Sequence, residues 1–133
     1  MRKMEYSGKY HLTKFEFGYA KWYSLRYNDW IEEYNSLKDS VKGVTYEETV
    51  KGGKRGDPTE KLAARRADLR DKILKIENAA FEAGGEIAKY ILIAVTNEDI
   101  TFQVLKSKYS IPCERTYYYE KRRKYYYLLS QEI

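Results

Sequence analysis

The feature that most constrains the fold is a helix start at residues 57–60, followed by a long amphipathic run. Asp57 can cap a helix, Pro58 suits the first helical position because its missing N–H costs nothing there, and Glu60 completes a capping box. The apolar positions recur at helical spacing until Gly84-Gly85, which should end the helix. They are Leu62, Leu69, Ile73, Ile76 and Ala80. We predict a long central helix whose short stripe packs within the chain rather than forming a dimeric coiled coil.

Two helices are expected before this one. Thr13 can cap the first, with Glu16 in the matching capping-box position, and that helix should end near Tyr27. Its apolar residues at helical spacing are Phe15, Tyr19, Trp22 and Tyr23. Asn28 can cap the second helix, which should run to about Lys42. Its apolar residues are Trp30, Ile31, Tyr34, Leu37 and Val41. These segments predict an aromatic-rich helical hairpin.

The pattern breaks between the hairpin and the central helix. Residues 51–56 hold three glycines and three cations without an apolar side chain, which is typical of a flexible basic linker. A solvated loop is favoured there, and direct phosphate contact by Lys51, Lys54 or Arg55 is the alternative. No segment shows strand alternation, so the expected class is all-α. The expected domains are a hairpin over 1–42, a linker over 43–57, and a long helix with a C-terminal helical unit over 58–133.

The C-terminal third predicts a trihelical unit. A strongly apolar helix should end around Thr96-Asn97, and its core positions are Ile87, Tyr90, Ile91, Ala94 and Val95. Phe102 and Leu105 can bury together on a second, short helix, and residues 109–112 break the pattern. A third helix should then begin at a cap on Cys113 and run to about Leu129. This order is typical of a helix-turn-helix, whose second helix lies in the major groove of DNA.

Charge is concentrated in the same place. The chain has 25 Lys and Arg against 20 Asp and Glu, a formal charge of +5. Within the predicted recognition helix, five cations stand against Glu114 and Glu120, and Lys106 and Lys108 precede it. The five cations are Arg115, Lys121, Arg122, Arg123 and Lys124. A cationic helix in this motif suits DNA, because phosphate contacts supply most of the affinity of such proteins.

Position within the helix suggests the role of each side chain. The early residues Arg115, Tyr118 and Tyr119 are candidates for reading bases, and Arg115 can bond guanine through two hydrogen bonds. The remaining candidates for DNA contact, mostly at phosphates, are Lys106, Lys108, Lys121, Arg122, Arg123 and Lys124. Tyr118 shares a helix face with Tyr125 and Leu129. Spacing alone therefore leaves open whether Tyr118 is a reader or a core residue.

Other classes of function find little support in the composition. Cys113 is the only cysteine and His11 the only histidine, so neither a disulfide nor a zinc cluster can be assembled from this chain. No carboxylate, cysteine–histidine or glycine-rich phosphate motif predicts an enzyme or a cofactor. We also expect no signal peptide and no membrane span, and a cytoplasmic location in a bacterial host cell.

Residues 111–129 carry a family resemblance as well. Their pattern, IPC-x-x-TYY-x-x-RRK-x-YYLL, resembles the C-terminal end of RinA- and ArpU-type regulators of phages and prophages of Gram-positive bacteria. The resemblance implies a role in switching on late phage genes. These families are similar in turn to the DNA-binding fourth region of sigma factors, where Ile100-Thr101-Phe102 resembles the start of the bracing helix.

The leading hypothesis is a sequence-specific transcriptional regulator that binds double-stranded DNA as a homodimer, because a single helix-turn-helix usually needs two half-sites. The hairpin over residues 13–42 would serve either self-association or contact with host RNA polymerase. The alternative hypothesis is a phage DNA-packaging oligomer similar to a small terminase subunit, which also joins a helix-turn-helix to a helical oligomerisation region.

Overall fold

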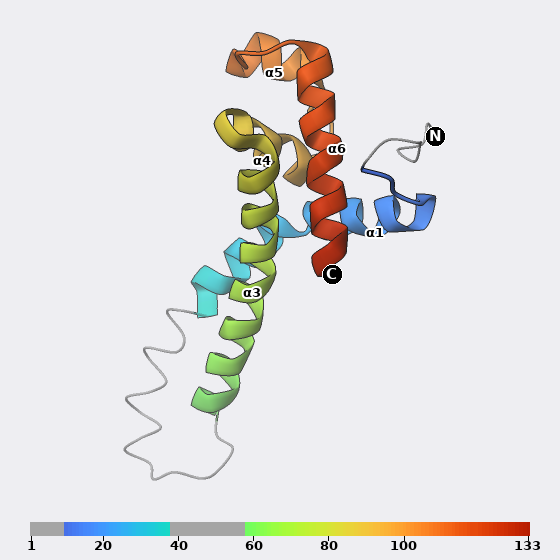
Figure 1. Ribbon diagram of the computed structural model, residues 1–133. Coiled ribbons are helices and arrows are strands. Elements are labelled where there is room, and N and C mark those ends of the chain that lie inside the picture. Colours follow the sequence, from blue (N-terminus) through green and yellow to red (C-terminus); the bar gives the residue numbers. More distant parts are fainter. Residues whose placement is uncertain (1–9, 38–57) are drawn as a thin grey trace. The chain divides into compact units, whose positions relative to one another are not determined.

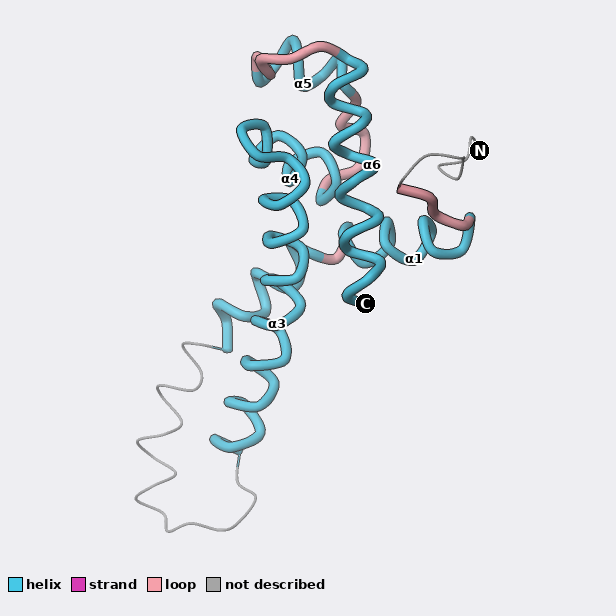
Figure 2. The backbone as a smooth tube through the Cα atoms, in the orientation of Figure 1, coloured by secondary structure: helices cyan, strands magenta, loops and turns pink. Residues whose placement is uncertain are grey.

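The computed structural model describes residues 10–37 and 58–133, and every regular element in these ranges is helical (Figures 1 and 2). The expected all-α class is therefore confirmed. The expected linker over 43–57, its three cations, the Asp57 cap and the end of the second helix at Lys42 lie outside the described residues.

Helix α1 spans Lys14–Leu25 and begins as the sequence predicts. The Glu16 N–H donates to Thr13 Oγ1 at 3.1 Å, and the Thr13 N–H donates to Glu16 Oε1 at 3.0 Å. The helix ends at Leu25 rather than Tyr27, and helical structure resumes over residues 27–37. Asn28 lies inside this second stretch, so the prediction that it caps the helix is wrong. A single non-helical residue, Arg26, separates the two helical stretches.

The buried face of α1 differs from the aromatic stripe seen in the sequence. Phe17, Ala20, Tyr23 and Ser24 are buried. The residues Phe15, Tyr19 and Trp22 are 82%, 51% and 52% exposed. The stripe at helical spacing is thus real, but apart from Tyr23 it lies on the outer side of the helix.

Helix α3 spans Pro58–Gly84, with Pro58 as its first residue and Glu60 in its first turn. The predicted inner stripe is buried at Leu69, Ile73, Ile76 and Ala80, while Leu62 is half-buried. Gly85 follows with φ +56°, a left-handed conformation that suits glycine. Both the start and the stop of the long helix are confirmed.

Three short or medium helices complete the chain after a 3-10 turn at Gly85–Ile87. Helix α4 spans Ala88–Thr96, α5 spans Phe102–Tyr109, and α6 spans Arg115–Glu132. The cap of α6 is Glu114 and not Cys113, and its side chain makes no capping hydrogen bond. The last helix therefore begins at Arg115 and continues beyond Leu129, the end expected from the sequence.

The described residues form two compact units. Unit 1 holds residues 10–27 and 75–133, and unit 2 holds residues 28–37 and 58–74. In unit 1, α1 packs against α6 and α4, and α6 also contacts α4. The Ser24 and Tyr125 hydroxyl groups are buried 2.7 Å apart and join α1 to α6. Figure 1 shows α1 crossing α6, with α5 near the first turn of α6.

Unit 2 combines the buried apolar side chains of Trp30, Leu69 and Ile73 with polar contacts around them. The Arg65 guanidinium donates to both carboxylate oxygens of Glu33, at 2.9 and 3.0 Å. Arg66 donates to the Tyr34 hydroxyl at 3.1 Å, and the Lys72 ammonium lies 5.2 Å from the centre of the Trp30 ring. These pairs join the helical stretch 28–37 to the first half of α3.

Candidate nucleic-acid interface

A small apolar cluster fixes α5 against the start of α6. Phe102, Leu105, Ile111 and Tyr118 are all buried, and the Phe102 and Tyr118 rings lie 5.5 Å apart. Burial of this cluster favours a single arrangement of the two helices, because each apolar side chain stabilises the pair only when it is removed from water. The expected joint burial of Phe102 and Leu105 is confirmed.

The turn between the two helices is closed by backbone hydrogen bonds. Ser110 adopts a left-handed conformation with φ 55° and ψ 46°, and its N–H donates to the Leu105 carbonyl. The Ile111 N–H also donates to the Leu105 carbonyl, at 3.1 Å. At the other end of α5, the Thr101 hydroxyl accepts from the Val104 N–H at 3.2 Å. Helix α5 is therefore capped at both ends.

Lys106 adds a side-chain contact to this turn. Its ammonium group donates to the carbonyl oxygens of Ile111 and Cys113, at 3.2 and 3.3 Å. The group therefore neutralises the partial negative charge of turn carbonyls. Lys106 was expected to hold a phosphate, but in the structure its charge stabilises the turn that positions α6.

The inner face of α6 consists of Tyr118, Tyr125, Tyr126 and Leu129, all buried. Tyr118 is only 1% exposed, and its burial raises the pKa of its phenol above the ordinary value. A side chain enclosed in this way cannot reach a base edge without unpacking the core. The structure therefore places Tyr118 in the core and removes it from the candidate base readers.

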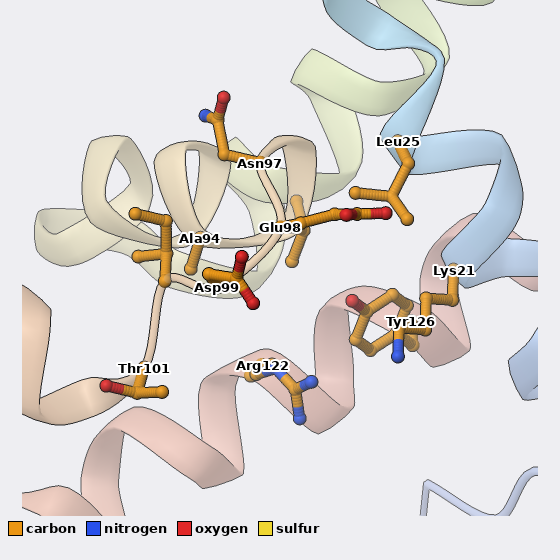
Figure 3. Close-up of a pocket in the computed structure, with 11 residues that line it drawn as sticks. Lys21, Leu25, Ala94, Asn97, Glu98, Asp99, Thr101, Arg122 and Tyr126 are labelled. Atoms are coloured by element: carbon orange, nitrogen blue, oxygen red, sulfur yellow. The ribbon is translucent and has the colours of Figure 1, made fainter.

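Arg122 also lies on the inner side of α6. Its guanidinium is 5.2 Å from the centre of the Tyr126 ring and 5.8 Å from that of Tyr119. It lines an open pocket of about 290 Å³ together with Lys21 and the acidic pair Glu98 and Asp99 (Figure 3). Arg122 was expected to hold a phosphate, and in the structure its half-buried guanidinium lies over two tyrosine rings.

Tyr119 and Arg123 are each half-buried. The Tyr119 ring lies 4.7 Å from that of Tyr118, so the base-reading role expected for it competes with packing. Burial lowers the pKa of the Arg123 guanidinium from its ordinary value. These two side chains border the exposed face of α6 rather than project from it.

The exposed face of the first half of α6 is formed by residues one to two turns apart. It contains Thr116, Tyr117 and Glu120, with the half-buried Lys121 and Lys124 beside them. The Lys121 ammonium lies 5.0 Å from the centre of the Tyr117 ring. We call these five residues the outer face of α6. The helical spacing opposite Tyr118 and Tyr125 could have identified Thr116 and Tyr117, which the sequence analysis missed.

Two further predicted residues are exposed on the α5–α6 pair. Arg115 is the first residue of α6, and its guanidinium lies 5.2 Å from the centre of the Phe102 ring. Lys108 lies in the last turn of α5. With Lys121 and Lys124, they give four cations at the surface of the α5–α6 pair. The structure thus places Tyr118 in the core, half-buries Arg122 and gives the exposed Lys106 a contact with the turn, while the other predicted cations stay at the surface.

Few residues in the described ranges could form another kind of functional site. No group of three or more His, Cys, Asp or Glu residues there could hold a metal ion. Burial is the largest cause of a raised pKa at Cys113, which disfavours the reactive thiolate. Within residues 10–37 and 58–133, no helix is both long and apolar enough to cross a membrane.

Comparisons with known proteins give no match for this chain, whether with family models, with curated proteins or with solved structures.

Proposed function

We propose that α4, α5 and α6 form a helix-turn-helix and that the chain is a sequence-specific regulator that binds double-stranded DNA. The observation that carries the proposal is the outer face of α6 with its neighbouring cations. This face carries Lys121 and Lys124 together with the hydroxyl side chains of Thr116 and Tyr117, exposed Arg115 begins the same helix, and exposed Lys108 lies in the last turn of α5. Cations suit phosphates, and hydroxyl groups and arginine suit base edges.

The rigidity of this face supports the proposal. A recognition helix must enter the major groove in a fixed orientation, because misplaced side chains cannot satisfy base edges. The buried cluster around Phe102 and Tyr118 holds the first half of α6, and the Lys106 ammonium ties the turn before it. Buried Tyr125 and Tyr126 hold its second half within unit 1. The outer face is thus carried by a helix that is packed along its length.

The division of roles follows from exposure. Arg115 is placed to read a base, with Thr116 and Tyr117 as additional readers near the start of the helix. Lys108, Lys121 and Lys124 hold phosphates. The resemblance of residues 111–129 to RinA- and ArpU-type regulators supports late phage genes as the target and host RNA polymerase as a further partner.

Selection of bound sequences from random double-stranded DNA tests this proposal. At low salt the protein should bind much of the pool, and at higher salt a common motif should be enriched, because non-specific binding is mostly electrostatic. Arg115→Ala should bind DNA but enrich a more degenerate motif at one position. The absence of any enrichment, together with no binding at low salt, would exclude DNA as the ligand.

A further inference from the structure

Phe81 lies on the surface of unit 1 beside an apolar hollow. Its side chain is 72% exposed, although it belongs to the last turns of α3. The hollow has a volume of about 330 Å³ and lies between α3 and α4. It is lined by Glu77, Asn78, Ala80, Phe81, Ala88, Lys89 and Leu92. A protruding aromatic ring next to an apolar depression is an arrangement typical of a protein–protein contact.

Small residues create this hollow. Ala80 and Ala88 are buried with their methyl groups against the junction of α3 and α4. Gly84 lets the helices approach, because a Cβ atom there would lie 3.2 Å from Ile91 Cγ1 and 3.3 Å from the Ala88 Cβ. The chain therefore packs α4 tightly onto the end of α3 and leaves space on the outer side, where Leu92 forms part of the wall.

We propose that Phe81 of one copy of this chain occupies the hollow of a second copy, and that the two copies are related by a two-fold axis. The Phe81 ring is the knob and the hollow beside it is the hole. Because both lie on the same face, they form a self-complementary patch. Such a patch gives a closed dimer, because each copy donates one knob and receives one. The occupant of the hollow is thus a second copy of the chain.

The charges at the rim of the hollow favour the same pairing. Glu77 lies on α3 and the exposed Lys89 lies on α4. Because Phe81 also lies on α3, its insertion beside Ala88 and Leu92 brings α3 of one copy against α4 of the other. Glu77 of each copy then lies near Lys89 of the other copy, which carries the opposite charge. The Glu77 carboxylate accepts the Tyr27 hydroxyl proton at 2.5 Å, which holds its position.

The size of this contact sets its expected strength. Two phenyl rings and the two hollows that receive them would bury on the order of 600–800 Å². A contact of this size is smaller than a stable dimer interface, which buries about 1,200 Å² or more, so the association should be weak and transient. We therefore expect a monomer–dimer equilibrium that depends on concentration. The dimer would present two α6 helices to one DNA duplex. Only this consequence rests on the proposed function, and the dimer itself does not.

Sedimentation velocity on the full chain without DNA tests the proposal, over a concentration series from low micromolar to near millimolar. The unmodified chain should dimerise, and Phe81→Ser should weaken dimerisation by at least about tenfold, because the ring is the central contact. The matched control is Phe15→Ser, which removes an even more exposed phenylalanine from α1 and should leave the equilibrium unchanged. Circular dichroism of each variant checks that the fold is kept.

A mixing experiment sharpens the test. Leu92→Trp should fill the hollow and abolish dimerisation, while Phe81→Ser lacks the knob. A mixture of these two variants should form a heterodimer, because one intact ring then meets one open hollow and no ring meets a filled one. Three results would each overturn the proposal: a monomer at every concentration, a larger ring, or loss of the dimer with Phe15→Ser but not with Phe81→Ser. None of them bears on DNA binding.

Discussion

The buried hydroxyl pair between α1 and α6 gives a sharp test of how unit 1 is held together. Ser24 Oγ and the Tyr125 hydroxyl oxygen lie 2.7 Å apart, and both side chains have no exposed surface. Ser24 donates its own proton to the Ala20 carbonyl at 2.8 Å. A hydroxyl group has one proton, so both contacts are hydrogen bonds only if Tyr125 donates to Ser24, and we infer that direction.

This direction makes the two single substitutions unequal. Ser24→Ala leaves a buried phenol O–H without an acceptor, which costs about 1–3 kcal/mol of unfolding free energy. The higher helix propensity of alanine offsets up to about 0.5 kcal/mol of that loss. Tyr125→Phe removes the donor and leaves Ser24 bonded to Ala20, so it should cost only about 0.5–1.5 kcal/mol. The double variant should cost less than the sum of the two, because it leaves no unsatisfied group.

Urea unfolding followed by circular dichroism measures all three variants. Ser107→Ala is the matched control, since it makes the same replacement at an exposed position of α5 and should change stability by less than about 0.5 kcal/mol. A Ser24→Ala variant that is more stable than Tyr125→Phe would refute the assigned direction of the bond. Strictly additive effects would refute the contact itself.

Three further predictions concern single positions. Gly85→Ala should destabilise the protein by about 1 kcal/mol, because Gly85 has a positive φ. Gly18→Ala should stabilise it by up to about 1 kcal/mol in the same unfolding assay, because a Cβ atom there meets no atom within 4 Å. The opposite signs would contradict the backbone conformation at these two glycines. Near neutral pH, Cys113 should react with iodoacetamide more slowly in the folded protein than in the protein unfolded in urea, because burial raises the thiol pKa and lowers the thiolate fraction. The rate for the folded protein should rise at higher pH. Equal rates for the folded and unfolded protein would refute this prediction. Arg122→Gln should weaken DNA binding less than Lys121→Gln in fluorescence anisotropy, because the Arg122 guanidinium lies over the Tyr119 and Tyr126 rings. The reverse order would restore the role expected from sequence.

Local signals in the sequence located the helix ends well. Thr13 with Glu16, Pro58 and Gly85 each act through atoms within one turn of the chain, so the printed residues suffice to predict them. Asn28 and Cys113 failed for a related reason. Both are next to a turn, and the choice of the capping residue there depends on how the following helix packs.

The orientation of each helix was harder to predict than its presence. In α1, aromatic residues occupy both faces, so helical spacing alone could not decide between Phe15 and Phe17. In α6, cations and tyrosines surround most of the helix, and the inner face is determined by contacts with α1 and α4. Arg122 was therefore grouped with the surface cations, although it lines a pocket that three separate segments form.

The role of Lys106 shows the same limit. Its charge is plain in the sequence, but the carbonyl groups that accept its protons belong to a turn whose shape depends on the left-handed Ser110. A charge count treats such a lysine and one that makes no contact with a turn alike. The structure separates them.

The salt dependence of DNA affinity tests the central claim most directly. We compare the unmodified chain, the double variant Lys121→Gln with Lys124→Gln, and a control, Lys61→Gln with Arg70→Gln, which removes the same charge from exposed positions of α3. Fluorescence anisotropy on one duplex, over a range of salt concentrations, gives the slope of log affinity against log salt. The outer-face variant should lose affinity at low salt and reduce that slope by about 2, because two phosphate contacts are gone, while the control keeps the original slope. Equal slopes for all three proteins would contradict the assignment of α6 to DNA.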